Sequence, residues 1–157
     1  MKFCADSSFI VRLYDPVTDP REAETIRRYL ADDNKTISVS ELCRIEVLNV
    51  LLRKPRDAAV EKFESDVREG VRLRLERVDW HKAFQQAESL ARRFSPALRP
   101  GGHDLVLVAA AVVMGSVWFL SFDRNSRQRP LAAVAGLRLW PALEKDEKGL
   151  VKRASIA

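Results

Sequence analysis

The sequence predicts an α/β fold, namely a three-layer α/β/α sandwich around a central, mainly parallel sheet of about five strands. Short apolar runs of strand character alternate with amphipathic helical segments along the whole chain, and no low-complexity linker interrupts the 157 residues. This alternation is typical of a parallel sheet with helices on both faces. The length suits one domain. We expect that domain at residues 1–141, followed by a charged C-terminal tail at 142–157.

The first half of the chain alternates strand and helix patterns. Ser38 and Glu41 have the spacing of a capping box, which predicts that a helix starts after Ser38. Pro55 stops this helix, and Gly70 ends the next one. The expected elements are a strand at 2–5, helices at 7–14 and 21–31, a strand in ThrIleSerVal (36–39), a helix that ends before 55, and a helix at 57–68. The apolar face of the helix after Ser38 consists of Leu42, Ile45, Leu48 and Leu52.

The second half contains a long apolar run, from Leu105 to Phe122, that must be distinguished from a membrane span. Gly115 and Ser116 divide it into an alanine-rich helical part and a strand-like part, so we expect a buried helix followed by a central strand. The alternation in ValArgLeuArgLeu (71–75) predicts a strand with one solvent-facing side. The other elements expected here are a helix at 80–94, a loop at 96–102, a helix that continues through 135 and a strand at 137–140.

The composition is that of a soluble globular protein with an excess of positive charge. The net charge is +5, and 19 arginines stand against 8 lysines. Arginine has a planar, weakly hydrated group that suits phosphate oxygens, so this balance favours a nucleic-acid partner, although many basic proteins bind none. Cys4 and Cys43 lie in apolar stretches and are expected to be buried, reduced thiols. Charged residues interrupt the first twenty positions, so we expect no signal peptide and a cytoplasmic location.

Acidic residues follow two of the apolar runs. Asp6 comes directly after the first predicted strand, and Asp123 follows the strand in the long apolar run. A carboxylate at the exit of a buried strand is costly unless a site uses it, and open α/β sheets bind ligands beyond the carboxyl ends of their strands. Asp104, at the start of a helix, and Glu46, within one, are expected to complete an acidic pocket. Each aspartate also has an alternative role as the N-cap of a helix.

Two glutamates compete for a place in this pocket. Glu41 is explained by the capping box, whereas Glu46 lies beside the apolar face of its helix. An inward-facing carboxylate needs a partner, so we assign Glu46 to the site and Glu41 to a structural role. Asn49, one turn further on, is expected to hold the Glu46 carboxylate or a bound water. A pocket of four carboxylates indicates a hard divalent cation, and with it phosphate chemistry.

Four segments of the chain, taken together, resemble the motifs of the PIN domain family. They are AlaAspSerSer (5–8), IleGluValLeuAsn (45–49), AspLeuValLeuValAlaAlaAla (104–111), and PheLeuSerPheAsp (119–123) with the later AlaGlyLeu (135–137). Each motif is short, and their order and spacing carry the resemblance, which covers Asp6 to Trp140. The likeness extends to VapC-type ribonuclease toxins of bacterial toxin–antitoxin pairs.

The resemblance implies a metal-dependent endoribonuclease, the toxin of such a pair, with Mg²⁺ as cofactor and Mn²⁺ as a plausible substitute. The metal-binding acids of the family match Asp6, Glu46, Asp104 and Asp123. Its small polar residue two positions after the first acid matches Ser8, which would position a ligand or a water. Many members have a histidine three residues after the third acid, where this chain has Leu107, and His103 does not match that position.

The resemblance also implies two macromolecular partners, an RNA substrate and a cognate antitoxin protein. The amphipathic helices between 41 and 68 suggest a pairing surface, so a homodimer is expected. We further expect the antitoxin to occupy a groove between these helices, with Val60 and Phe63 among its exposed apolar positions.

The main alternative is a non-catalytic PIN-like module that binds RNA or a protein. Such a module is expected to have lost one or more acids, and this chain retains all four. A dinucleotide-binding oxidoreductase is poorly supported because no GxGxxG follows a strand. A phosphatase of the haloacid dehalogenase type would need an aspartate where Ser8 stands. A receiver-like domain would need paired acids near the first strand and a lysine after a late strand, and neither is present.

Overall fold

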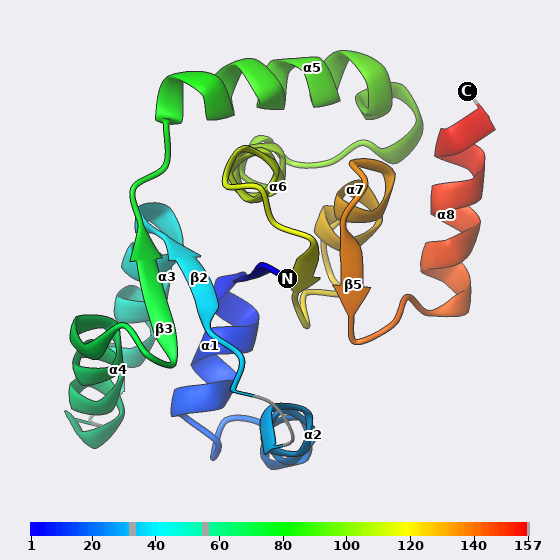
Figure 1. The fold of residues 1–157 in the computed structure, drawn as a ribbon. Coiled ribbons are helices and arrows are strands. Elements are labelled where there is room, and N and C mark those ends of the chain that lie inside the picture. The colour runs from blue at the N-terminus through cyan, green and yellow to red at the C-terminus, as the bar shows by residue number, and fades with distance from the viewer. Residues whose placement is uncertain (32–33, 55–56, 157) are drawn as a thin grey trace.

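A computed structural model describes residues 1–31, 34–54 and 57–156, and within them five strands form one sheet. The strands are β1 (Phe3–Ala5), β2 (Ile37–Ser40), β3 (Leu73–Glu76), β4 (Trp118–Leu120) and β5 (Arg138–Trp140). Their order is β3-β2-β1-β4-β5, with β1 at the centre (Figure 1). All neighbouring strands are parallel; Phe3, for example, pairs with Ile37 on one side and Trp118 on the other. The predicted parallel sheet is confirmed.

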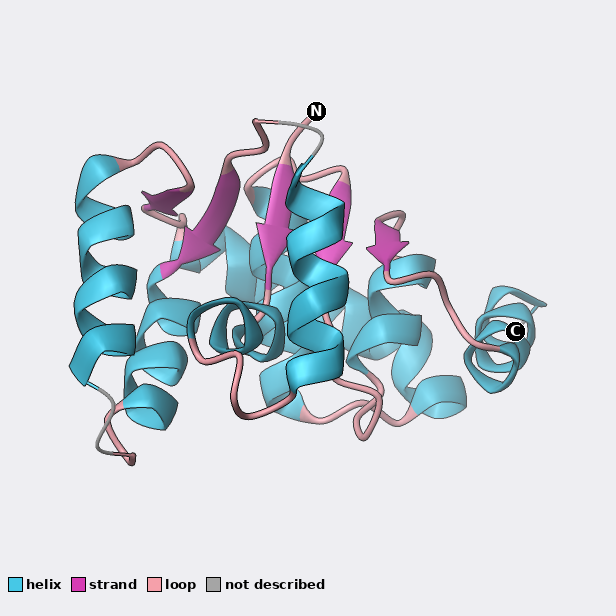
Figure 2. Cartoon of the chain, turned by 90° about the horizontal axis from the view of Figure 1, so that it is seen from below, coloured by secondary structure: helices cyan, strands magenta, loops and turns pink. Residues whose placement is uncertain are grey.

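Helices cover both faces of the sheet, which gives three layers (Figure 2). One face packs against α1 (Ser7–Tyr14), α2 (Pro20–Ala31), α3 (Glu41–Leu51) and α4 (Asp57–Glu69). The other packs against α5 (Trp80–Leu98), α6 (Gly102–Val113), α7 (Gln128–Val134) and α8 (Lys145–Ile156). Successive strand residues alternate between the two cores, as in β1, where Ala5 joins the first core and Cys4 the second. The expected α/β/α sandwich is therefore confirmed.

The chain leaves two neighbouring strands toward opposite faces of the sheet. β1 leads into α1 on the first face, and β4 leads into α7 on the second. The carboxyl ends of β1 and β4 therefore border the switch point at which open α/β sheets bind ligands. Asp6 directly follows β1, and Asp123 lies three residues after the end of β4.

Helix α3 buries a different face from the one expected. Cys43, Val47 and Leu51 are at most 2% exposed, whereas Ile45 and Leu52 are 64% and 67% exposed. The helix is apolar on two sides, and each side has helical spacing. Packing against α1 and the sheet decides which side is buried, so the prediction of the Leu42 to Leu52 face as the buried one was wrong.

The start of α3 also differs from the expected capping box. Ser40, rather than Ser38, is the N-cap, and its Oγ accepts the Cys43 N–H at 3.1 Å. Ser38 remains within β2 and donates a 2.8 Å hydrogen bond to Glu76 Oε1. The strand continues to Ser40 because it pairs with β3 as far as Glu76.

The C-terminal segment forms a packed helix instead of a loose charged tail. Helix α8 lies against α5 and α7 (Figure 1). Its Glu147 Oε2 accepts a 2.9 Å bond from Nε of Arg129, which is completely buried. Arg129 also donates to the carbonyl oxygens of Pro141 (2.8 Å) and Ala142 (3.0 Å). A buried guanidinium requires such partners, and the expectation of a loose tail was wrong.

Two element boundaries differ from the expected ones. β3 begins at Leu73 instead of at 71, and Val71 is exposed. Helix α5 continues to Leu98, through Pro96, into the segment expected to be a loop. Arg99 ends it in the left-handed conformation (φ 50°), with its N–H bonded to Ser95 O at 2.9 Å.

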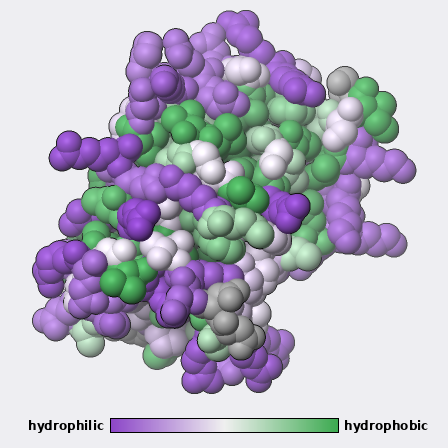
Figure 3. Space-filling model, viewed as in Figure 1, coloured by the Kyte–Doolittle hydropathy of each residue, from purple (hydrophilic) through white to green (hydrophobic). Residues whose placement is uncertain are grey.

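The long apolar segment of the chain forms part of the folded core. The run from Leu105 to Phe122 divides into α6 and β4, as expected. No helix in the described parts of the chain is long and apolar enough to cross a membrane. On the face seen in Figure 3, hydrophilic side chains occupy the margins and apolar ones gather toward the centre. Cys4 and Cys43 are buried and free of disulfide bonds, as expected.

Candidate active site

Asp6 is held at the exit of β1 by three hydrogen bonds. It caps α1 by accepting the Phe9 N–H at 3.2 Å on Oδ1, so the capping role considered for it is real. Ser8 Oγ donates to the same oxygen at 2.6 Å, and Ser121 Oγ donates to Oδ2 at 2.7 Å. The side chain is 3% exposed. Burial raises the pKa of Asp6 from 3.8 to about 6, with a further increase from the charge of Asp123, although the three hydrogen bonds oppose the change.

The two serines that bind Asp6 also fix the loop after β4. Ser8 Oγ accepts the Phe122 N–H at 2.9 Å, and Ser121 Oγ accepts the Asp123 N–H at 3.1 Å. Each hydroxyl thus links the Asp6 carboxylate, which follows β1, to the backbone after β4. Ser8 was singled out from the sequence, whereas Ser121 was missed because it lies inside an apolar strand pattern.

Asp123 stabilises the turn that follows β4. Its Oδ1 accepts the N–H groups of Asn125 (3.2 Å) and Ser126 (3.3 Å), and its Oδ2 accepts the Ser126 hydroxyl (3.0 Å). Helix α7 starts only at Gln128, so Asp123 caps this turn and not the helix. The carboxylate is half-buried and lies near enough to Asp6 and Asp104 to raise the pKa of both.

Asp104 occupies the first turn of α6. Its Oδ2 accepts the Gly101 N–H at 3.3 Å, and the residue is 8% exposed. Burial is the main cause of a raised pKa for Asp104, and the charge of Asp123 adds to it. The Gly101 bond, the nearby His103 and a bond from Ser126 act in the opposite direction. The charge of Asp123 therefore acts on both Asp6 and Asp104.

Glu46 is the acid that α3 contributes. Its Oε2 lies 2.9 Å from Nε2 of His103 and 3.5 Å from the Ser7 hydroxyl. Its Oε1 is buried and has no hydrogen-bond partner among the described residues. The contact between Glu46 and His103 could not be predicted from the sequence, because the histidine lies 57 residues away on α6.

Glu41 lies outside the pocket. Its Oε1 accepts both the Val78 N–H and the Trp80 Nε1–H at 3.1 Å, and so ties α3 to the segment between β3 and α5. This arrangement is structural, although it differs from the expected capping box.

A family model described as the PIN domain matches residues 3–132. The chain belongs to the PIN domain family. The resemblance noted in the sequence is therefore confirmed at the level of this family.

This PIN domain is also similar to a solved structure. The crystal structure of VapC20 from Mycobacterium tuberculosis, described as a sarcin-ricin loop cleaving toxin, matches it with a TM-score of 0.61. The two are 20% identical, and the match covers 87% of this chain and 96% of that one. At this identity the likeness concerns the fold. None of the curated protein sequences matches the chain.

Asn49, expected to hold the Glu46 carboxylate or a bound water, is exposed. Glu46 Oε2 contacts His103 and Ser7, and Oε1 has no partner among the described residues, so the expected contact with Asn49 is not formed.

Two arginines that follow Asp123 in this PIN domain have structural partners. Arg129 is the buried partner of Glu147, and Arg124 forms ion pairs with Glu22 (3.3 Å) and Glu144 (3.0 Å).

The four acids have the donor chemistry of a cation site. Within the described ranges, no three His, Cys, Asp or Glu side chains are already gathered as ligands of a single ion. The donors are nevertheless carboxylate oxygens, which hard divalent cations prefer. A bound cation would lower the raised pKa values of Asp6 and Asp104. It would also give a partner to Oε1 of Glu46, which has none among the described residues. These residues fit a divalent metal.

Proposed function

We propose that this PIN domain is a metal-dependent endoribonuclease that hydrolyses RNA phosphodiester bonds, and that it is the toxin of a toxin–antitoxin module. One observation carries the proposal: Asp6 and Asp123 follow the two neighbouring strands that border the switch point of the sheet, and Asp123 lies near enough to Asp104 to raise its pKa. Membership of the PIN domain family supports a nuclease, and the likeness to VapC20 supports a toxin.

Mg²⁺ is the proposed cofactor, with Mn²⁺ as a substitute. Asp6, Asp104 and Asp123 would hold it directly or through water, and Glu46 would complete the set. Two carboxylates about 4 Å apart repel by roughly 4 kcal/mol at an effective dielectric constant near 20, and a divalent cation removes that cost. When bound, the metal would activate a water and stabilise charge on the phosphate oxygens.

The chain's own groups would orient the reaction. Ser8 and Ser121 hold Asp6 and the Asp123 loop in a fixed relation. His103 engages Oε2 of Glu46, which leaves Oε1 as the oxygen able to accept a proton from the attacking water. Direct attack by water on phosphorus forms no covalent intermediate with the protein. The products would carry a 5′-phosphate and a 3′-hydroxyl, as the family resemblance implies.

An RNA substrate accords with the net charge of +5. Since the proposed substrate is found in the cytoplasm, the cytoplasmic location expected from the sequence belongs to the same proposal.

The proposed antitoxin surface is the outer side of α3 and its neighbour α4. Ile45 and Leu52 are large apolar residues exposed there, and amphipathic segments bind to apolar surfaces of this kind. Phe63, expected to be part of the surface, is 0% exposed and packs edge-on against Tyr14 at 5.4 Å, so that expectation was wrong. Val60 is half-buried. The expected homodimer would compete for the same surface and remains a prediction.

Cleavage of total cellular RNA by the full chain tests the enzymatic proposal. We expect cleavage with Mg²⁺ or Mn²⁺, little with Ca²⁺, whose larger and more flexible shell positions a water less strictly, and none after chelation. Asp104→Asn should be inactive, and Asp146→Asn, an exposed aspartate on α8, should be fully active. End analysis should find 5′-phosphates. Full activity after exhaustive chelation would exclude the metal mechanism, and no cleavage under any condition would favour the non-catalytic module.

A further inference from the structure

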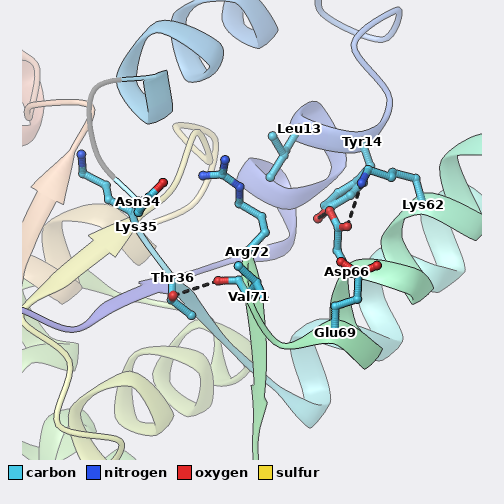
Figure 4. Close-up of a pocket in the computed structure, with 10 residues that line it drawn as sticks. All are labelled: Leu13, Tyr14, Asn34, Lys35, Thr36, Lys62, Asp66, Glu69, Val71 and Arg72. Atoms are coloured by element: carbon cyan, nitrogen blue, oxygen red, sulfur yellow. Dashed lines mark hydrogen bonds and ion pairs between the residues drawn. The ribbon is translucent and has the colours of Figure 1, made fainter.

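A cavity of about 650 Å³ lies at the edge of the sheet opposite the acids (Figure 4). Thr36 and Arg72 line it where the chain enters β2 and β3, whereas Asp6 and Asp123 follow strands at their carboxyl ends. Tyr14, at the end of α1, and Lys62, on α4, form its other side. The volume is in the range of small-molecule sites.

Arg72 is the unusual group in this cavity. It lines both this space and a second cavity of about 530 Å³ between α1 and α2. Its side chain extends from the start of β3 toward Leu13 and Asn34 (Figure 4). Its Nη1 is buried and has no hydrogen-bond acceptor among the described residues. A buried charged donor without a protein acceptor is costly.

The acids around Arg72 are already engaged with other groups. Asp66 accepts the Tyr14 hydroxyl at 2.6 Å and the Lys62 ammonium at 2.9 Å, and these bonds use both of its oxygens (Figure 4). Glu69 accepts the Ser65 hydroxyl at 3.4 Å. Among the described residues that line the cavity, Arg72 therefore carries a buried donor without an acceptor.

We propose that this cavity binds a phosphate group, either free phosphate or the phosphate of a nucleotide, with Arg72 as its principal contact. A guanidinium presents paired donors that match phosphate oxygens. Binding would require the Arg72 side chain to rotate, so that Nη1 turns from its buried position into the space that Asn34 and Lys62 also line. The site is separate from the proposed nuclease pocket, although α1 connects them: Asp6 caps its first turn, and Leu13 and Tyr14 at its other end line the cavity.

Calorimetric titration of the full chain with inorganic phosphate, in the presence of a chelator, tests the proposal. Chloride at matched ionic strength is the reference. We expect saturable binding that Arg72→Gln weakens about tenfold or more, as befits the loss of a hydrogen bond to a charged group. Arg74→Gln removes the same charge from an exposed position two residues further along β3 and should leave the affinity unchanged. Adenosine 5′-monophosphate serves as a second probe: tighter binding than phosphate identifies a nucleotide site, and binding of phosphate alone identifies a free-phosphate site.

Nuclear magnetic resonance of the wild-type protein provides a measurement that does not depend on the folding of Arg72→Gln. Phosphate should shift the amide signals of Tyr14, Thr36 and Arg72, and should shift them equally in Asp104→Asn. Equal affinity of the two arginine variants, shifts confined to other regions, or no binding beyond that of chloride would overturn the proposal. Because these readouts measure binding without metal or RNA, they stay independent of whether the protein cleaves RNA.

Discussion

Ser121 donates a 2.7 Å hydrogen bond to Oδ2 of Asp6 and so joins two parts of the chain that are 115 residues apart. Ser121 is completely buried and directly follows β4, and Asp6 directly follows β1. The same hydroxyl accepts the Asp123 N–H. One side chain thus sets the relative position of the two aspartates that follow neighbouring strands.

Ser121→Ala should lower RNA cleavage by about 10- to 100-fold, the range seen when a residue that supports metal ligands is removed. The free energy of unfolding should fall by about 1–3 kcal/mol, because the buried Asp6 oxygen loses its donor. Initial rates at saturating Mg²⁺ and urea denaturation measure the two effects. Ser155→Ala, at an exposed position on α8, is the control. Wild-type activity in Ser121→Ala would show that Asp6 is held well enough without it.

Asp6→Asn should be inactive, and without metal it should be more stable than the wild type at neutral pH. The pKa of Asp6 is raised to about 6 in the folded protein, so the folded state holds its proton more tightly than the unfolded state. The resulting stability is complete below about pH 4 and is lost as the pH rises through 6. The neutral asparagine avoids this loss, which is about 3 kcal/mol at most.

Urea denaturation from pH 4 to 7.5 with a chelator measures this difference. The advantage of Asp6→Asn over the wild type should grow between pH 4 and 6 and stay constant above. Asp146→Asn should show no such trend, since that residue is exposed. A difference independent of pH would mean that burial does not control the protonation of Asp6.

Glu46→Gln and Glu41→Gln should separate the two glutamates of α3. Glu46→Gln should reduce cleavage by on the order of 100-fold, because the amide cannot accept a proton or carry the charge that stabilises the transition state. Glu41→Gln should remain close to wild type, since a single amide oxygen can still accept the N–H groups of Val78 and Trp80. Initial rates under identical conditions decide the matter. The reverse result would move the site glutamate to Glu41.

Glu147→Ala should destabilise the protein by about 3–5 kcal/mol, because it leaves the guanidinium of Arg129 buried without its carboxylate. Thermal or urea unfolding measures the loss. Lys152→Ala, on the exposed side of α8, should change stability by no more than about 0.5 kcal/mol. Equal stability of the two variants would mean that α8 does not contribute to the folded domain.

Ile45→Asp should weaken inhibition by the antitoxin by about fivefold or more while RNA cleavage stays unchanged, because Ile45 is exposed on the outer side of α3. Expression of the protein alone should arrest growth, and co-expression of a small DNA-binding protein encoded beside it should restore growth. Rescue should fail for Ile45→Asp and succeed for Phe84→Asp, which changes an exposed apolar residue on α5. Rescue of both would place the antitoxin on another surface.

The fold class and three of the site acids follow from local sequence. Asp6, Asp104 and Asp123 each stand at a junction between a strand or loop and the next segment, and such junctions are visible in the alternation of apolar and polar residues. The carboxyl ends of parallel strands meet at one edge, so Asp6 and Asp123 could be brought together without knowledge of the packing. The choice of Glu46 over Glu41 rested on a capping box and an apolar face that differ from those in the structure, and the role of Glu46 stays a prediction.

Tertiary structure decided what depends on contacts between distant segments. Helix α3 has two apolar sides, and its neighbours select the one with Cys43 and Val47. Glu46 contacts His103, and Arg129 is buried against Glu147 of α8. These contacts join separate segments, so the local pattern of either segment does not predict them. Spacing along a helix or strand specifies which residues share a side, but only the packed neighbours determine which side is buried. The sequence therefore determined most of the elements and the candidate acids, and the packing determined helix α8 and the partners that hold those acids in place.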